Sequence, residues 1–136
     1  MMVFSVDSSK NVKIIENTIF SNQGNGITFT STDKSDVNLN TIYTNTANDD
    51  YFSDSSNNLI SNNNIKDGDS GIYVEYGRGN IITRNILSHN VYGVNIYVDN
   101  NKISYNQFHS SVFDGILVNG YGNNIEYNNI TNAYWD

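Results

Sequence analysis

A repeat of about 22 residues, running along nearly the whole chain, constrains this sequence more than any other feature. An asparagine followed two positions later by an apolar residue recurs six times, at spacings of 23, 23, 22, 21 and 22 residues: Asn17, Asn40, Asn63, Asn85, Asn106 and Asn128. Three residues before each asparagine stands a β-branched residue, which gives the column Ile14, Val37, Ile60, Ile82, Ile103 and Ile125. A fixed period of this length is typical of solenoids, in which each repeat buries its apolar side against its neighbours.

A further segment of each repeat reads glycine, apolar, any residue, apolar, and occupies residues 26–29, 71–74, 93–96 and 115–118. In the second repeat, Asp49-Asp50-Tyr51-Phe52 replaces this motif. Each repeat thus holds three short alternating segments separated by turn-forming residues, and a 22-residue rung of such segments returns above its start. The chain is therefore predicted to be all-β: a right-handed parallel β-helix solenoid of about six coils, each of 21–23 residues with three short strands, forming a single domain over residues 1–136.

The asparagine column is predicted to form a structural ladder. In register, each side-chain amide donates to the next asparagine and accepts from the previous one, as in fibrillar asparagine stacks. Asparagine also tolerates the left-handed backbone of a tight corner, so we expect the ladder residues themselves to adopt it. A second, partial column is expected to behave in the same way at the preceding corner: Asn58, Asn80, Asn101 and Asn123.

Composition excludes several function classes. Cysteine is absent, and the net charge of −7 repels phosphate backbones, so nucleic acid is not an expected partner. The sequence has no apolar run of 18 residues that would span a membrane. Residues 1–4 lack the basic region of an export signal. Residues 1–10 and 128–136 read as partial coils, which predicts a segment of a longer array whose partners are further coils or a second copy stacked end to end.

The asparagine steps, the preceding isoleucine column and the Gly-Ile-x-Val segments resemble the right-handed parallel β-helix repeat family, over about residues 11–131. This family belongs to the pectate-lyase-like superfamily, and the chain is most similar to its NosD-like cell-surface arrays. The resemblance implies an extracellular or cell-envelope location and a structural or adhesive role; contact with polysaccharide is expected through one exposed sheet face. The alternative is a fragment of a carbohydrate-active lyase, hydrolase or epimerase, because one fold serves many functions. NosD-like proteins are linked with copper, but two histidines and no cysteine give no copper cluster, so no cofactor is expected.

The uniform period leaves no long loop that could wall a catalytic cleft, which argues against an autonomous enzyme. The best acidic cluster is Asp49, Asp50, Asp67 and Asp69, at comparable corners of coils two and three. Such carboxylates suit a weak Ca²⁺ site or glycoside hydrolysis, but solvated turn aspartates are the favoured interpretation. The other polygalacturonase motifs (Asn-Thr-Asp, Gly-His-Gly and Arg-Ile-Lys) are absent.

One outward sheet face is the predicted ligand site. It combines aromatic rings with amide and carboxylate groups, which suit the apolar faces and hydroxyl rims of sugars. Its residues lie on adjacent rungs of coils three to five: Tyr73, Glu75, Asn95, Tyr97 and Asn119. The alternative is that tyrosine is here simply a favourable exposed strand residue.

Overall fold

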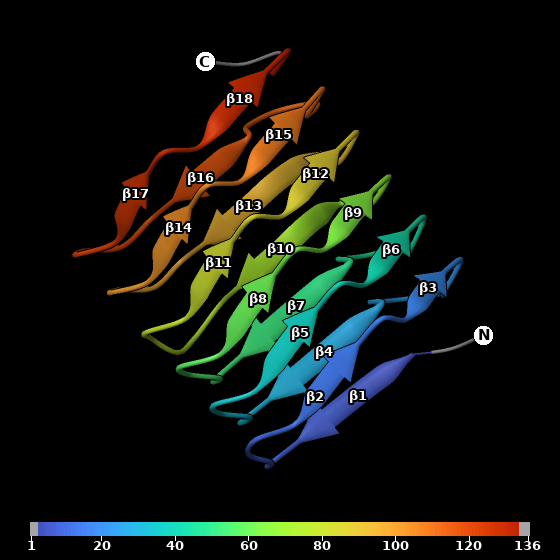
Figure 1. Cartoon of the computed structure of the whole chain (residues 1–136), viewed down its shortest axis with the longest axis vertical. Coiled ribbons are helices and arrows are strands. Elements are labelled where there is room, and N and C mark those ends of the chain that lie inside the picture. Colours follow the sequence, from blue (N-terminus) through green and yellow to red (C-terminus); the bar gives the residue numbers. More distant parts are fainter. Residues whose placement is uncertain (1–2, 134–136) are drawn as a thin grey trace.

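The computed structural model describes residues 3–133 and consists of three parallel sheets wound into one stack of coils (Figure 1). Sheet 1 contains β1 (Phe4–Asp7), β4 (Ile27–Thr30), β7 (Asp50–Ser53), β10 (Ser70–Val74), β13 (Tyr92–Ile96) and β16 (Ile116–Val118). Sheet 2 contains β2 (Lys13–Ile15), β5 (Asp36–Asn38), β8 (Leu59–Ser61), β11 (Ile81–Thr83), β14 (Lys102–Ser104) and β17 (Asn124–Glu126). Sheet 3 contains β3 (Thr18–Phe20), β6 (Thr41–Tyr43), β9 (Asn64–Lys66), β12 (Ile86–Ser88), β15 (Gln107–His109) and β18 (Asn129–Thr131).

Each strand pairs in parallel with its counterparts in the adjacent coils. In sheet 2, Ile14 lies opposite Val37, and Ile82 lies between Ile60 and Ile103. At the amino-terminal end, Phe4 and Val6 pair with Ile27 and Phe29, so β1 is the edge strand of sheet 1. The predicted architecture of about six coils with three strands each is confirmed.

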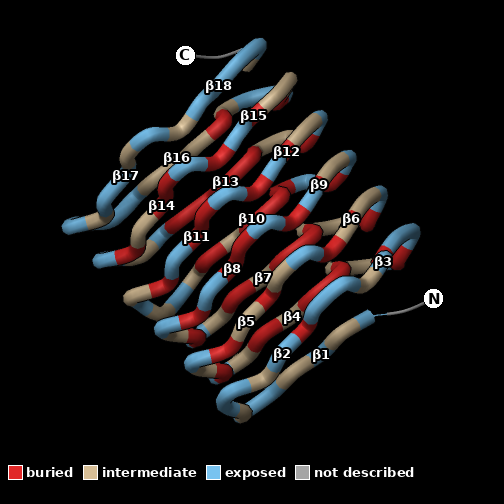
Figure 2. The backbone as a smooth tube through the Cα atoms, in the orientation of Figure 1, coloured by how far each residue is buried: buried red, intermediate tan, exposed pale blue. Residues whose placement is uncertain are grey.

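The core is a set of apolar files along the inside of the stack. Buried residues gather in the central coils, whereas the last coil, β17 and β18, is exposed (Figure 2). The largest buried side chains are Phe29, Phe52 and Phe108, and the rings of Phe29 and Phe52 meet edge to face at 5.1 Å. A single coil cannot bury its inward side, so stacking supplies the hydrophobic stabilisation.

The asparagine ladder forms as predicted. The Nδ2 of each member donates to the Oδ1 of the next at 3.0–3.1 Å, through all six residues from Asn17 to Asn128. The same Oδ1 also accepts the backbone N–H of the preceding ladder residue at 2.9 Å. From Asn40 onward, Nδ2 additionally donates to a core-strand carbonyl such as that of Ile14. Each amide thereby pairs backbone groups that a tight corner would leave unsatisfied.

The left-handed backbone conformation was expected at the ladder asparagines, and this expectation was wrong: it occurs one residue earlier in each coil. The left-handed residue is the one that precedes each ladder asparagine: Glu16, Leu39, Asn62, Arg84, Tyr105 and Tyr127, with φ between 55° and 58°. These side chains point away from the core, so residues as different as glutamate and tyrosine occupy the position. The asparagine is needed for its amide, and its tolerance of left-handed backbone plays no part.

The second column also forms a ladder in its later members. Asn80 donates to Asn101 at 3.1 Å, and Asn101 donates to Asn123 at 3.3 Å. Asn58 instead joins through its backbone N–H, which donates to Asn80. Earlier in the chain Ser35 holds the same place, and its N–H donates to the Oδ1 of Asn58.

The last coil exposes core positions. Ile125 and Ile130 belong to files whose other members are buried, yet they are 48% and 47% exposed. Further coils or a second copy would cover them, and this expectation stays a prediction. Tyr134, Trp135 and Asp136, which were expected to leave the last coil unfinished, lie outside the described residues.

Stacking predicts how strongly a file residue stabilises the fold. Ile82 is fully buried with a neighbour on each side, so Ile82→Ala should lower the free energy of unfolding by about 2–5 kcal/mol through cavity formation. Ile125→Ala is the matched control in the same file and should cost clearly less, because its outer side faces solvent. Denaturant melts of the two variants test this, and equal losses would contradict the stacking account.

Candidate functional site

The predicted ligand residues lie on the outer side of sheet 1 and the turn that follows it. Tyr73 on β10 lies opposite Asn95 on β13, and the pairing of Val74 with Ile96 places Glu75 opposite Tyr97. Asn119 follows β16 and bonds through its N–H to the carbonyl of Ile96 at 2.7 Å. The five residues therefore occupy adjacent rungs.

The tyrosine rings of this face cover one another. Tyr73 stacks on Tyr51 at a centroid distance of 5.5 Å and an interplanar angle of 14°, and on its other side it meets Tyr97 at 5.8 Å and 51°. Tyr73 thus has an aromatic neighbour on each side and is only half-exposed, so less of its ring is open to a sugar than that of Tyr97. Tyr97 is 44% exposed and stands at the end of the row, so its ring is the accessible one.

Two further side chains of this face are less available to a ligand: Glu75 is hydrogen-bonded and Asn95 is buried. The Tyr51 hydroxyl donates to Glu75 at 2.5 Å, and this bond is the main cause of a raised Tyr51 pKa. Asn95, predicted to face a ligand, is only 6% exposed, and its Oδ1 has no partner among the described residues. Tyr97 and Asn119 are therefore the freest members of the predicted set.

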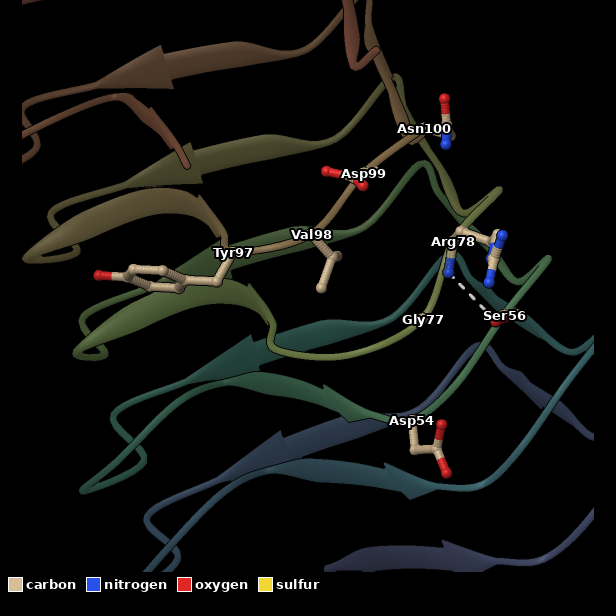
Figure 3. A pocket seen from close by; sticks show the side chains of 8 residues that line it. All are labelled: Asp54, Ser56, Gly77, Arg78, Tyr97, Val98, Asp99 and Asn100. Carbon is tan, nitrogen blue, oxygen red and sulfur yellow. Dashed lines mark hydrogen bonds between the residues drawn. The ribbon is translucent and has the colours of Figure 1, made fainter. Parts of the chain in front are cut away.

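A hollow of about 370 Å³ lies beside Tyr97, at the corner where sheet 1 turns into sheet 2 (Figure 3). Three successive coils line it: Asp54 and Ser56 from coil two, Gly77 and Arg78 from coil three, and Tyr97, Val98, Asp99 and Asn100 from coil four. The Arg78 backbone N–H donates to the Ser56 hydroxyl at 3.1 Å, which ties two of these corners together. Of the residues predicted for ligand binding, only Tyr97 lines the hollow.

A change in corner length coincides with the hollow. In coil three the chain takes six residues from the buried Val74 to the ladder residue Asn80. In coil four it takes only five from Ile96 to Asn101, although Val74 pairs with Ile96 and Asn80 bonds to Asn101. The shorter corner cannot lie directly over the longer one, so the surface steps inward there. The single 21-residue spacing between Asn80 and Asn101 was the sequence signal for this site.

The hollow is polar and carries both signs of charge. Asp54, Arg78 and Asp99 are exposed, so their charges remain solvated. Asp99 accepts the backbone N–H of Tyr121 at 2.7 Å, which fixes its carboxylate on the coil-five side. The arrangement offers one aromatic ring and several hydrogen-bonding groups for a polar ligand.

The acidic cluster does not lie as expected. Asp67 and Asp69 are exposed, but Asp49 and Asp50 are fully buried, so the interpretation of these two as solvated turn aspartates was wrong. Asp50 pairs with Ile27 on one side and Ile72 on the other and thus stands in an apolar file of the core. Neither of its carboxyl oxygens has a hydrogen-bond partner among the described residues. Burial is the main cause of an Asp50 pKa well above its ordinary value.

Asp49 fills a gap in a third polar column that the sequence analysis missed. Five residues after the main ladder stand Asn22, Asn45, Gly68, Asn90 and Ser111. Asn22 donates to Asn45 at 2.8 Å, but Gly68 has no amide to continue the bond. Asn45 donates instead to Asp49 at 2.7 Å, and the Asp49 carboxylate lies where a Cβ on residue 68 would be, only 2.5 Å from its Oδ2. Gly68 and Asp49 are thus matched to one another.

Burial raises the Asp49 pKa to about 8, and the bond from Asn45 opposes this shift only in part. Within residues 3–133, no group of three or more histidine, cysteine or acidic side chains could hold a metal ion. The structure separates the four aspartates into a buried and an exposed pair, and a weak Ca²⁺ site on them stays a prediction. Residues 3–133 contain no helix long and apolar enough to cross a membrane.

Comparison with known families identifies the class of protein. Residues 3–134 match the family described as "Right handed beta helix region". The chain therefore belongs to the right-handed β-helix family. No curated protein matches it. No solved structure matches it either.

Replacing the buried carboxyl of Asp50 with an apolar group should stabilise the fold. Asp50→Val keeps a similar volume and removes the unpartnered oxygens, so the free energy of unfolding at pH 7 should rise by about 1–3 kcal/mol in denaturant melts. Asp50→Asn is the matched control: it removes the charge but leaves polar atoms without partners, and it should gain less. A loss of stability in Asp50→Val would show that the carboxyl has a partner.

The raised Asp49 pKa predicts a pH-dependent stability. Between the ordinary pKa of 3.8 and the folded value of about 8, the folded state binds more protons than the unfolded state. Stability is therefore greatest at the acidic end and falls as pH rises through this window, by up to about 1.4 kcal/mol per pH unit.

Asp49→Asn keeps an acceptor for Asn45 and should reduce the fall in unfolding free energy between pH 5 and pH 8. Asp50 still titrates in this variant, so some slope should remain. An unchanged slope would contradict the burial of an ionisable Asp49.

Proposed function

We propose that this chain is a structural or adhesive β-helix module of the cell envelope or the extracellular space, which contacts polysaccharide at the hollow beside Tyr97. The observation that carries the proposal is an accessible aromatic ring next to a polar hollow of about 370 Å³. Carbohydrate sites combine such a ring with hydrogen-bonding groups that fix the sugar's orientation. Arg78, Asp54 and Asn100 are the groups within reach of a sugar on Tyr97.

The repeat spacing supports a chain-like ligand. Adjacent rungs are about 4.8 Å apart along the axis, close to the length of one hexose. The hollow takes residues from three rungs, so it matches a short run of sugar units laid along the axis. Binding at one such site should be weak, because an open hollow buries little of the ligand.

The proposed site gives Tyr73 and Tyr97 different roles. Tyr73 and Tyr97 were both predicted as ligand residues from the sequence, but the Tyr73 ring already has Tyr51 on one side and Tyr97 on the other. Tyr97 is therefore the proposed stacking residue, and Tyr73 supports it from the side. Glu75 is held by Tyr51, and Asn119 remains free at the margin.

A glycan array followed by titration calorimetry on the best ligand tests the site. Tyr97→Ala should weaken binding by about tenfold, or about 1.4 kcal/mol, and more than Tyr73→Ala does. Tyr43→Ala is the matched control, because Tyr43 is also a stacked tyrosine, on Phe20 at 5.1 Å, but lies in sheet 3. Binding that survives the Tyr97 substitution would place the site elsewhere.

An activity assay distinguishes a fragment of a carbohydrate-active enzyme from a module that only binds. Purified protein incubated with a panel of acidic polysaccharides, with and without Ca²⁺, should leave the chains intact if the module only binds. Release of reducing ends or unsaturated products would favour a fragment of a lyase or hydrolase. If no glycan binds and none is cleaved, the module is purely structural.

A further inference from the structure

The chain contains two Asn-Gly steps, Asn25-Gly26 and Asn119-Gly120, and the fold treats them very differently. In such a step the glycine nitrogen can attack the asparagine side-chain carbonyl, because glycine lacks the Cβ that hinders this approach. The reaction needs a free side chain, a free glycine N–H and access to water. These requirements can be checked at both positions.

Asn25 meets none of the requirements well. Its Nδ2 donates to the Thr28 hydroxyl at 3.2 Å, and its Oδ1 accepts the N–H of Asn48 at 3.1 Å. The nucleophile is also occupied, since the Gly26 N–H donates to the Asn48 carbonyl at 3.1 Å and Gly26 is buried. Coil-to-coil hydrogen bonds therefore hold this step in an unreactive arrangement.

Asn119 is the opposite case. It follows β16, and both Asn119 and Gly120 are exposed. Within residues 3–133, the one hydrogen bond of this step is that from the Asn119 N–H to the Ile96 carbonyl, which leaves the Asn119 side chain and the Gly120 N–H without a partner. A Cβ on residue 120 would lie 2.4 Å from the Val98 carbonyl oxygen, so the fold requires glycine there and keeps the step intact.

We propose that Asn119 is a site of spontaneous deamidation and that Asn25 is protected by the fold. The Gly120 nitrogen bonds to the Asn119 side-chain carbon and loses its proton, while the amide nitrogen leaves as ammonia. Water then opens the succinimide at one of its two carbonyls and gives aspartate or isoaspartate. The product adds one negative charge to the net −7, beside Tyr97 on the face described above. This inference is independent of the proposed glycan binding.

Peptide mapping by mass spectrometry, after incubation of the folded protein at mildly alkaline pH, tests the proposal. The Asn119 peptide should convert to aspartate and isoaspartate several-fold faster than the Asn25 peptide, while both should convert at similar rates in urea. Asn119→Gln should abolish the acidic species seen on ion exchange, and Asn25→Gln should leave it unchanged. Equal rates in the folded protein, or an Asn119 that stays intact when folded and reacts only in urea, would overturn the proposal.

Discussion

Every coil of this solenoid depends on hydrogen bonds to the coils on either side of it. The strands are three to five residues long, and their main-chain groups pair with the next coil instead of within the coil. Corners would break this pairing, because their backbone groups have no strand partner. The asparagine ladders restore it: one amide accepts a backbone N–H, accepts a side-chain donor and donates in turn to a core carbonyl. The repeat of asparagine follows from this need.

The same coupling explains what could be predicted from sequence. An amide ladder and an apolar file both require one residue type at one period, so each leaves a column that is visible in the sequence. The fold, the main ladder and the strand register were all recoverable in this way. The third polar column was harder to see because Gly68 interrupts it, and its break is repaired by Asp49, from a different position of the rung. A compensation between two positions leaves no periodic signal.

The left-handed corner positions and Asp50 show a second limit. The conformational demand falls on the residue before the ladder, where glutamate, leucine, arginine and tyrosine all occur. Exposed side chains there bear no packing constraint, so the position carries no pattern. At Asp50 two sequence signals conflict. Its place in the register predicts a buried apolar residue, whereas an aspartate is expected in a solvated turn. The side chain follows the register and lies in the core, where burial raises the pKa of the Asp50 carboxyl.

Regular stacking also decides where a ligand can bind. Rungs about 4.8 Å apart bring equivalent aromatic side chains into contact, as with Tyr51 and Tyr73 at 5.5 Å or Phe20 and Tyr43 at 5.1 Å. A perfectly repeated face therefore covers its own rings and leaves mainly their edges to solvent. The hollow beside Tyr97 lies where the repeat changes, because the corner between Ile96 and Asn101 is one residue shorter than the corner before it. A change in the period is thus what sets this corner of the surface apart from the regular faces around it.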